Sequence, residues 1–220
     1  MTATLATTMA STVTTFRRAA YYRLYGADAL LARLVQPGAR VLDVGCSDGR
    51  GSEVLSRGPA YGVDIYRPTL ARAADDGRRR PVTQADVRAL PYATGAFDVV
   101  VSLDVVEHFE KPDALRVLAE MERVCSGTVV VVTPNGFVPQ PGTDDEPWQE
   151  HRCGFDVAEL EQLGYDVSGL GGPASLRGAY GTFRAGPLGQ AATAVCVPAA
   201  KRRPDRAFAL LGIKVLGRGG

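Results

Sequence analysis

Short apolar runs alternate with helical patterns along most of this 220-residue chain. The apolar runs lie at 39–44, 60–65, 97–103 and 128–133. They have the length of buried strands, and the first is preceded by the turn pair Pro37-Gly38. Between the runs, as over 111–124, apolar residues recur every three or four positions, which is typical of an amphipathic helix. This alternation predicts an α/β protein with a parallel sheet.

The same pattern predicts the rest of one α/β domain. Further strands are expected from Val82, from Gly164 and at 191–197, and helices at 16–35, 68–77, 111–124 and 155–163. Together they predict a seven-stranded, doubly wound, Rossmann-like sheet in a single domain at 16–200. Residues 1–15, rich in Thr and Ala without a period, are expected to be disordered, and 201–220 are expected to form a basic helix or tail.

Charge and cysteine content narrow the functional classes. The net charge is +1 and no basic patch with interleaved aromatic residues lies near the motifs, so nucleic acid is not expected as a partner. Residues 201–220 are short for a membrane-surface helix, so membrane contact is not expected either. The four scattered cysteines predict neither a disulfide framework nor a zinc site, and no metal is expected. No apolar run of about 18 residues and no signal peptide is evident, which favours a cytoplasmic protein.

The first apolar run ends in a glycine-containing turn, Asp43-x-Gly45-x-Ser47-x-Gly49, followed by a helical pattern. A dinucleotide site requires G-x-G-x-x-G, and Arg50 occupies the place of its last glycine. The Asp43 carboxylate would repel a pyrophosphate, whereas it would attract a ligand that carries an ammonium or sulfonium group. A P-loop is excluded because no Gly-Lys-Ser/Thr follows.

A second acid, Asp64, closes the next apolar run about 20 residues after Asp43, a spacing suited to accepting hydrogen bonds from ribose hydroxyls. The turn at 43–49 resembles motif I of the class I S-adenosylmethionine-dependent methyltransferases, with Ser47 in place of the usual middle glycine. Asp64, Asp86 and the pair Glu107-His108 are similar to the segments that follow the family's next three strands. The resemblance covers 39–133 and implies a mostly parallel sheet whose last strand is antiparallel.

The resemblance implies S-adenosyl-L-methionine as the cofactor. The residues expected to bind it are Asp43, Gly45, Cys46, Ser47, Gly49, Asp64, Ile65, Asp86, Val87, Leu103 and Tyr21. In this arrangement Asp86 would accept the adenine amino group, and Ile65 and Val87 would pack on the adenine ring. Tyr21 would face the sulfonium by a cation–π contact, although it also fits a helix that merely covers the sheet.

The loop at 137–154 is long for a compact domain, and such loops are usually functional. It holds the only Trp and one of the two His residues. His151 is the candidate general base, with a structural or orienting histidine as the alternative. His108 is expected to line the pocket or support it by a hydrogen bond, and Glu107 is a weaker base candidate. Trp148, Phe137 and Tyr22 are expected to contact the acceptor.

Three functional hypotheses follow from these residues. The first is a methyltransferase acting on a small molecule, most readily on oxygen and less readily on nitrogen or carbon. The second is a methyltransferase for a protein or lipid-linked acceptor, with the basic C-terminal segment as the docking element. The third is a non-catalytic module that binds S-adenosylmethionine. The sequence favours the first because it contains no separate partner-binding domain, and it leaves monomer and homodimer open.

Overall fold

The computed structural model describes residues 27–49, 52, 54–55, 60–75, 81–142, 147–178 and 182–217. The predictions for 1–15, for the first part of the helix at 16–35, and for Tyr21 and Tyr22 lie outside these residues.

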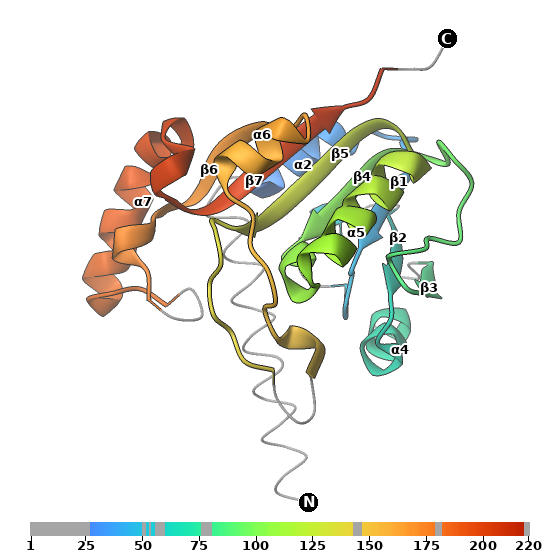
Figure 1. Cartoon of the computed structure of the whole chain (residues 1–220), viewed down its shortest axis with the longest axis horizontal. Coiled ribbons are helices and arrows are strands. Elements are labelled where there is room, and N and C mark those ends of the chain that lie inside the picture. The colour runs from blue at the N-terminus through green and yellow to red at the C-terminus, as the bar shows by residue number, and fades with distance from the viewer. Residues whose placement is uncertain are drawn as a thin grey trace, which may run out of the picture.

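A seven-stranded sheet forms the centre of the protein, with the strand order β3-β2-β1-β4-β5-β7-β6 (Figure 1). Its strands are β1 (Val41–Val44), β2 (Ala60–Asp64), β3 (Val82–Gln84), β4 (Phe97–Leu103), β5 (Cys125–Pro134), β6 (Asp166–Pro173) and β7 (Ala207–Val215). Strands β1 to β5 pair in parallel, and β7 runs antiparallel to both of its neighbours, β5 and β6. The predicted fold class and the antiparallel last strand are therefore confirmed.

Helices cover both faces of this sheet. They are α2 (Ala27–Leu34), α4 (Arg67–Asp75), α5 (Lys111–Val124), α6 (Val157–Gln162) and α7 (Gly186–Arg202). Because successive strand residues point to opposite faces, Val100 of β4 packs in the core under α5 and α6, whereas Val99 and Val101 pack in the core under α2. Each of these three valines is at most 5% exposed, so β4 is buried on both faces and reads as one apolar run.

The C-terminal part of the chain differs from the prediction. Residues 191–197, expected as the last strand, lie within helix α7, and the last strand is β7, which lies in the segment 201–220 expected as a helix or tail. Helix α7 is rich in alanine, the strongest helix former, and packs through small residues such as Gly189 and Ala200. Strand β7 lies inside the sheet between β5 and β6, so its apolar residues face both cores and show no clear alternation. The sheet therefore extends beyond residue 200.

In the described part of the chain, no helix has the length and apolar character that crossing a bilayer requires. The carboxyl ends of β1, β2 and β4 lie side by side in the sheet, because these strands are neighbours and parallel. This edge is where open α/β sheets bind ligands.

Candidate active site

The turn after β1 has three residues in the left-handed region of backbone space. Gly45 has φ +72°, Ser47 has φ +49° and Gly49 has φ +75°. Ser47 therefore takes a conformation that favours glycine, which is the residue usual at this position of the motif. The amides of Gly45 and Cys46 both donate to the Val63 carbonyl oxygen, at 2.8 and 3.1 Å, and so fasten the turn to β2.

Asp64 links the turn to the end of β2. Its Oδ2 accepts from the Ser47 amide at 2.9 Å, and its Oδ1 accepts from the Tyr66 amide at 2.8 Å. A carboxylate oxygen has two lone pairs, so each oxygen retains the capacity to accept one more hydrogen bond. Asp64 is thus held at the sheet edge in a form that suits a pair of ribose hydroxyls.

Three further predicted cofactor residues lie around this turn. Asp43, on β1, is 7% exposed and lies in register between Gly62 and Val101 of the neighbouring strands. The Cys46 thiol is buried beside the backbone of the turn, as a small space-filling side chain would be. Ile65 is 41% exposed, which leaves an apolar surface at the end of β2 for a flat ring to cover.

Asp86, after β3, is held by an arginine that the sequence prediction did not single out. Arg88 donates from Nη2 to Asp86 Oδ2 at 2.7 Å and from Nε to both carboxylate oxygens. Its Nη1 donates to Asp113 of α5 at 2.7 Å. The Arg88 guanidinium lowers the pKa of Asp86, so this carboxylate stays an acceptor near neutral pH. Val87 is only 5% exposed and packs in the core, which leaves little of its surface for a ligand.

The end of β4 leads directly into the next predicted group. Leu103 closes the strand at 9% exposure, and Asp104 follows in the left-handed region with φ +52°. A short 3-10 helix, η1 (Val106–His108), then presents Glu107 and His108. The Glu107 side chain is 1% exposed, and its Oε2 accepts a hydrogen bond from Thr133 Oγ1 of β5 at 3.2 Å.

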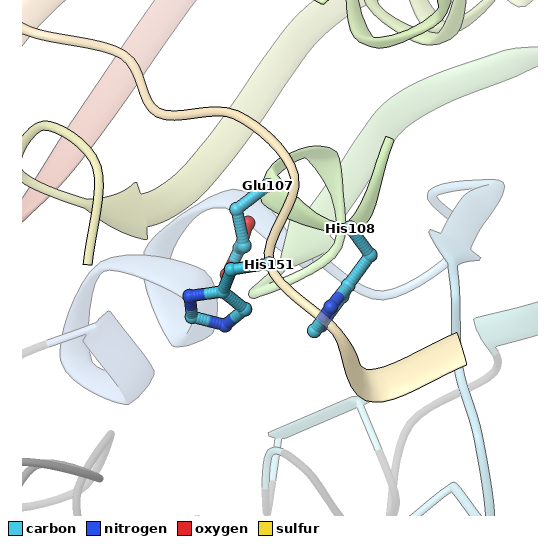
Figure 2. A group of neighbouring side chains, drawn as sticks. All are labelled: Glu107, His108 and His151. Atoms are coloured by element: carbon cyan, nitrogen blue, oxygen red, sulfur yellow. The ribbon is translucent and has the colours of Figure 1, made fainter. Parts of the chain in front are cut away.

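His151 joins Glu107 and His108 from a distant part of the chain (Figure 2). One nitrogen of each histidine and one carboxylate oxygen of Glu107 lie within 4.8 Å of one another. The two imidazole rings meet edge to face, with their centroids 4.9 Å apart. All three predicted catalytic residues therefore form one cluster, the 107/108/151 cluster, beside the end of β4.

Backbone hydrogen bonds hold the His151 loop against η1. The amides of Arg152 and Cys153 donate to the Glu107 carbonyl oxygen at 2.8 and 3.2 Å, and the His151 amide donates to the Gln140 carbonyl oxygen at 2.9 Å. Each histidine ring places Nδ1 on a carbonyl oxygen, His108 on that of Glu150 at 3.1 Å and His151 on that of Val138 at 2.7 Å. Because a carbonyl oxygen can only accept, Nδ1 carries the proton in the neutral rings and Nε2 carries the lone pair.

The predicted acceptor residues remain at the surface of the loop. Phe137 is 57% exposed and Trp148, in the 3-10 helix η2 (Pro147–Gln149), is 55% exposed. Large exposed aromatic side chains beside a polar cluster are available to a ligand, and their role stays a prediction.

Two residues that orient the predicted site residues were not predicted from the sequence. They are Arg88, which holds Asp86, and Thr133, which holds Glu107. The signal for Thr133 was its position as a polar residue near the end of a buried apolar run.

Residues 42–132 match the family model described as a methyltransferase domain. A probable S-adenosylmethionine-dependent methyltransferase of Mycobacterium tuberculosis is 32% identical over 131 residues, which are 58% of this chain and 47% of that protein. A probable tRNA methyltransferase 9B of Bos taurus is 32% identical over 136 residues, 59% of this chain and 30% of that protein. The chain thus spans about half or less of the length of these relatives. The prediction that nucleic acid is no partner gains no support from them.

The likeness of fold extends beyond the matched segment. The solved structure of an S-adenosylmethionine-dependent methyltransferase from Archaeoglobus fulgidus aligns with a TM-score of 0.55 at 18% identity, covering 86% of this chain and 93% of that one. The family match spans β1 to β5, whose ends carry the residues described above. Sequence and fold therefore agree: residues 42–132 match a methyltransferase domain and are similar to a probable S-adenosylmethionine-dependent methyltransferase, and the sheet around them has the fold of a solved one.

Proposed function

We propose that this protein transfers the methyl group of S-adenosylmethionine to an oxygen atom of a small-molecule acceptor. The observation that carries the proposal is the 107/108/151 cluster, which brings two imidazoles and a buried carboxylate to the sheet edge where β1, β2 and β4 end. Proton-accepting groups at this edge suit an acceptor that arrives protonated, such as a phenol or an alcohol.

In the proposed cofactor site, Asp64 accepts from the ribose hydroxyls, Asp86 accepts from the adenine amino group, and Asp43 faces the positively charged amino-acid end. The turn at 45–49 allows the cofactor to approach the backbone closely. Ile65 offers its exposed side chain to the adenine ring. Support comes from the position of these residues at neighbouring strand ends and from the two backbone amides that fix Asp64.

In the proposed reaction, the acceptor oxygen attacks the methyl carbon in line with the breaking carbon–sulfur bond. S-adenosylhomocysteine leaves with the bonding electron pair, and the hydroxyl proton passes to Nε2 of His151. The sulfonium is already an activated electrophile, so alignment supplies much of the rate, on the order of 7–11 kcal/mol. His108 and Glu107 orient His151 and stabilise the imidazolium that forms, while Trp148 and Phe137 hold the apolar part of the acceptor.

The test is to incubate the purified chain with S-adenosylmethionine and matched acceptors, a set of phenols and a set of carboxylates, and to measure S-adenosylhomocysteine formation. His151→Ala should lower turnover of phenols by about 10²–10⁴-fold, because they must lose a proton. Carboxylates arrive ionised and should be affected little. Gln149→Ala, two residues away on the same loop, is the matched control and should retain activity. Equal losses with both acceptor sets would contradict the base role of His151.

A second candidate acceptor is tRNA, because one relative is named a probable tRNA methyltransferase. The same assay with unmodified tRNA in place of the small molecules separates the two. Methyl transfer to tRNA, with no transfer to any phenol or alcohol, would replace the small-molecule proposal.

A further inference from the structure

We propose that Glu107, His108 and His151 form a binding site for one divalent transition-metal ion, and that this ion inhibits methyl transfer. Binding of the ion depends on the three side chains alone. The inhibition rests on the proposed function, because it assumes that His151 receives the acceptor's proton.

The spacing of the donor atoms suits a metal ion. Their nitrogens and oxygen lie within 4.8 Å of one another, and two ligands of one zinc ion, each at about 2.1 Å, can be at most about 4.2 Å apart. In a tetrahedral site this separation is about 3.4 Å, so side-chain adjustments that shorten each separation by at most about 1.4 Å would bring all three atoms onto one ion. The set of two imidazoles and one carboxylate is a recurring three-ligand set for Zn²⁺ and for other first-row divalent metals that leave a coordination position open.

The groups around the cluster resemble the supporting groups of metal sites. Ligating histidines almost always donate their second ring N–H to a carbonyl or carboxylate oxygen, which fixes the tautomer. Both histidines here place Nδ1 on a backbone carbonyl oxygen, of Glu150 for His108 and of Val138 for His151. Thr133 Oγ1 donates to Glu107 Oε2 and orients the carboxylate in the same way. In the neutral rings the lone pair that a metal ion needs is therefore on Nε2.

The charge and burial of the cluster favour a cation. The Glu107 side chain is 1% exposed, and a cation bound beside a buried carboxylate lowers the free-energy cost of its charge. Imidazole nitrogens select borderline metals such as zinc and cobalt over magnesium and calcium, which prefer oxygen ligands. The sequence does not reveal the site because His108 and His151 follow different strands and no short metal-binding motif contains both.

Occupancy and proton transfer exclude each other at His151. A metal ion coordinated by Nε2 takes the lone pair that the reaction uses for the acceptor's proton. Bound metal should therefore suppress turnover of phenols and alcohols, and a chelator should restore it.

The binding test uses the purified full chain, treated with EDTA and dialysed, with Zn²⁺ and Co²⁺ as probes. Calorimetry with Zn²⁺ should give one site, and Co²⁺ should develop the visible absorption of a site with few ligands. His151→Ala and His108→Ala should each weaken binding by at least about tenfold. Cys196→Ser, which changes the least buried of the free thiols in the structure, is the matched control and should bind normally. Circular dichroism of each variant confirms that it is folded.

Three outcomes would overturn the site: no saturable binding of either ion, unchanged binding in both folded histidine variants, or loss of binding in Cys196→Ser. Saturable binding that leaves turnover of phenols unchanged would keep the site but overturn the inhibition and the base role of His151. A chain that binds Co²⁺ through the two histidines but methylates none of the acceptors would leave the metal site standing and contradict the proposed function.

Discussion

The position that a Cβ atom would take at Gly45 overlaps Cγ2 of Val105. The turn after β1 therefore packs directly on the segment between β4 and η1. An alanine at position 45 would meet both this overlap and a backbone with φ +72°.

We expect Gly45→Ala to lower the free energy of unfolding by about 2–4 kcal/mol, from the left-handed backbone and the overlap together, and to weaken S-adenosylmethionine binding. Gly38→Ala is the matched control, because Gly38 has φ +86° with no atom within 4 Å of its Cβ position. It should show the backbone cost alone, about 1–2 kcal/mol. Denaturant unfolding measures both. If adding Val105→Ala to Gly45→Ala recovers no stability, the overlap is not the cause.

Asp64→Asn should weaken S-adenosylmethionine binding by about 10–100-fold, because hydrogen bonds to a charged acceptor contribute about 1.5–3 kcal/mol. The asparagine also loses one of the two side-chain oxygens that accept hydrogen bonds from the backbone amides of Ser47 and Tyr66. Calorimetric titration of the cofactor measures the change. Asp166→Asn, exposed at the start of β6, serves as the control and should leave the affinity as it is. Equal affinity in Asp64→Asn and the wild type would remove Asp64 from the cofactor site.

Arg88→Met should reduce the loss of stability in acid. Arg88 lowers the pKa of Asp86 in the folded state, so this pair stabilises the protein above the unfolded aspartate pKa of about 3.9. That stability is lost as the pH falls through the folded pKa of Asp86. Both side chains are more than a third exposed, which limits the effect to about 0.5–1 kcal/mol. Unfolding measured at pH 7 and pH 3 tests this, with Arg116→Met, which keeps the Asp86 pair, as the control.

Tyr165→Phe should reduce the loss of stability in alkali. Burial, and then the Glu122 carboxylate that accepts from its hydroxyl at 3.1 Å, raise the pKa of Tyr165. Folding therefore favours the protonated phenol, so stability falls as the pH rises above the unfolded tyrosine pKa of about 10. Thermal unfolding between pH 8 and about pH 11 measures the slope. Glu122→Gln should keep most of the alkaline loss, because burial is the larger cause. If Glu122→Gln showed no alkaline loss of stability, the Glu122 carboxylate would be the main cause of the raised pKa of Tyr165.

How much of this protein could be predicted depends on the position of each element in the sheet. Strands β1, β2, β4 and β5 lie in its parallel part, so they read as apolar runs, with Asp64 at the end of β2 and Asp104 directly after β4. The sequence predicts a strand within α7 and a helix or tail over β7, because both segments contain few polar residues. The alanine and valine residues of α7 at 191–197 fit both the helical and the strand period. Strand β7 packs against a hydrophobic core on each face, so its sequence lacks the alternation typical of a half-buried strand.

Some residues of the candidate site can likewise be predicted from the sequence, and others only from the fold. Asp64 and Glu107 follow from local sequence, because Asp64 ends β2 and Glu107 lies in η1, shortly after β4. The contact of His151 with Glu107 depends on how a long loop returns to η1, and that path is set by backbone hydrogen bonds that any residue type can make. Arg88 gave no signal of its own, since an exposed arginine is ordinary until the fold brings Asp86 and Asp113 to it.

Strand β7 has a consequence for synthesis of the protein. Among the strands that the structure describes, β7 comes last in sequence, yet it lies between β5 and β6 and is the strand with which β6 pairs. Until residues 207–215 have been synthesised, β1 to β5 can assemble with their helices, but β6 lacks the strand with which it pairs in the described structure. Its open edge is exposed until residues 207–215 emerge, which makes this interval the one in which a nascent chain most needs protection from aggregation.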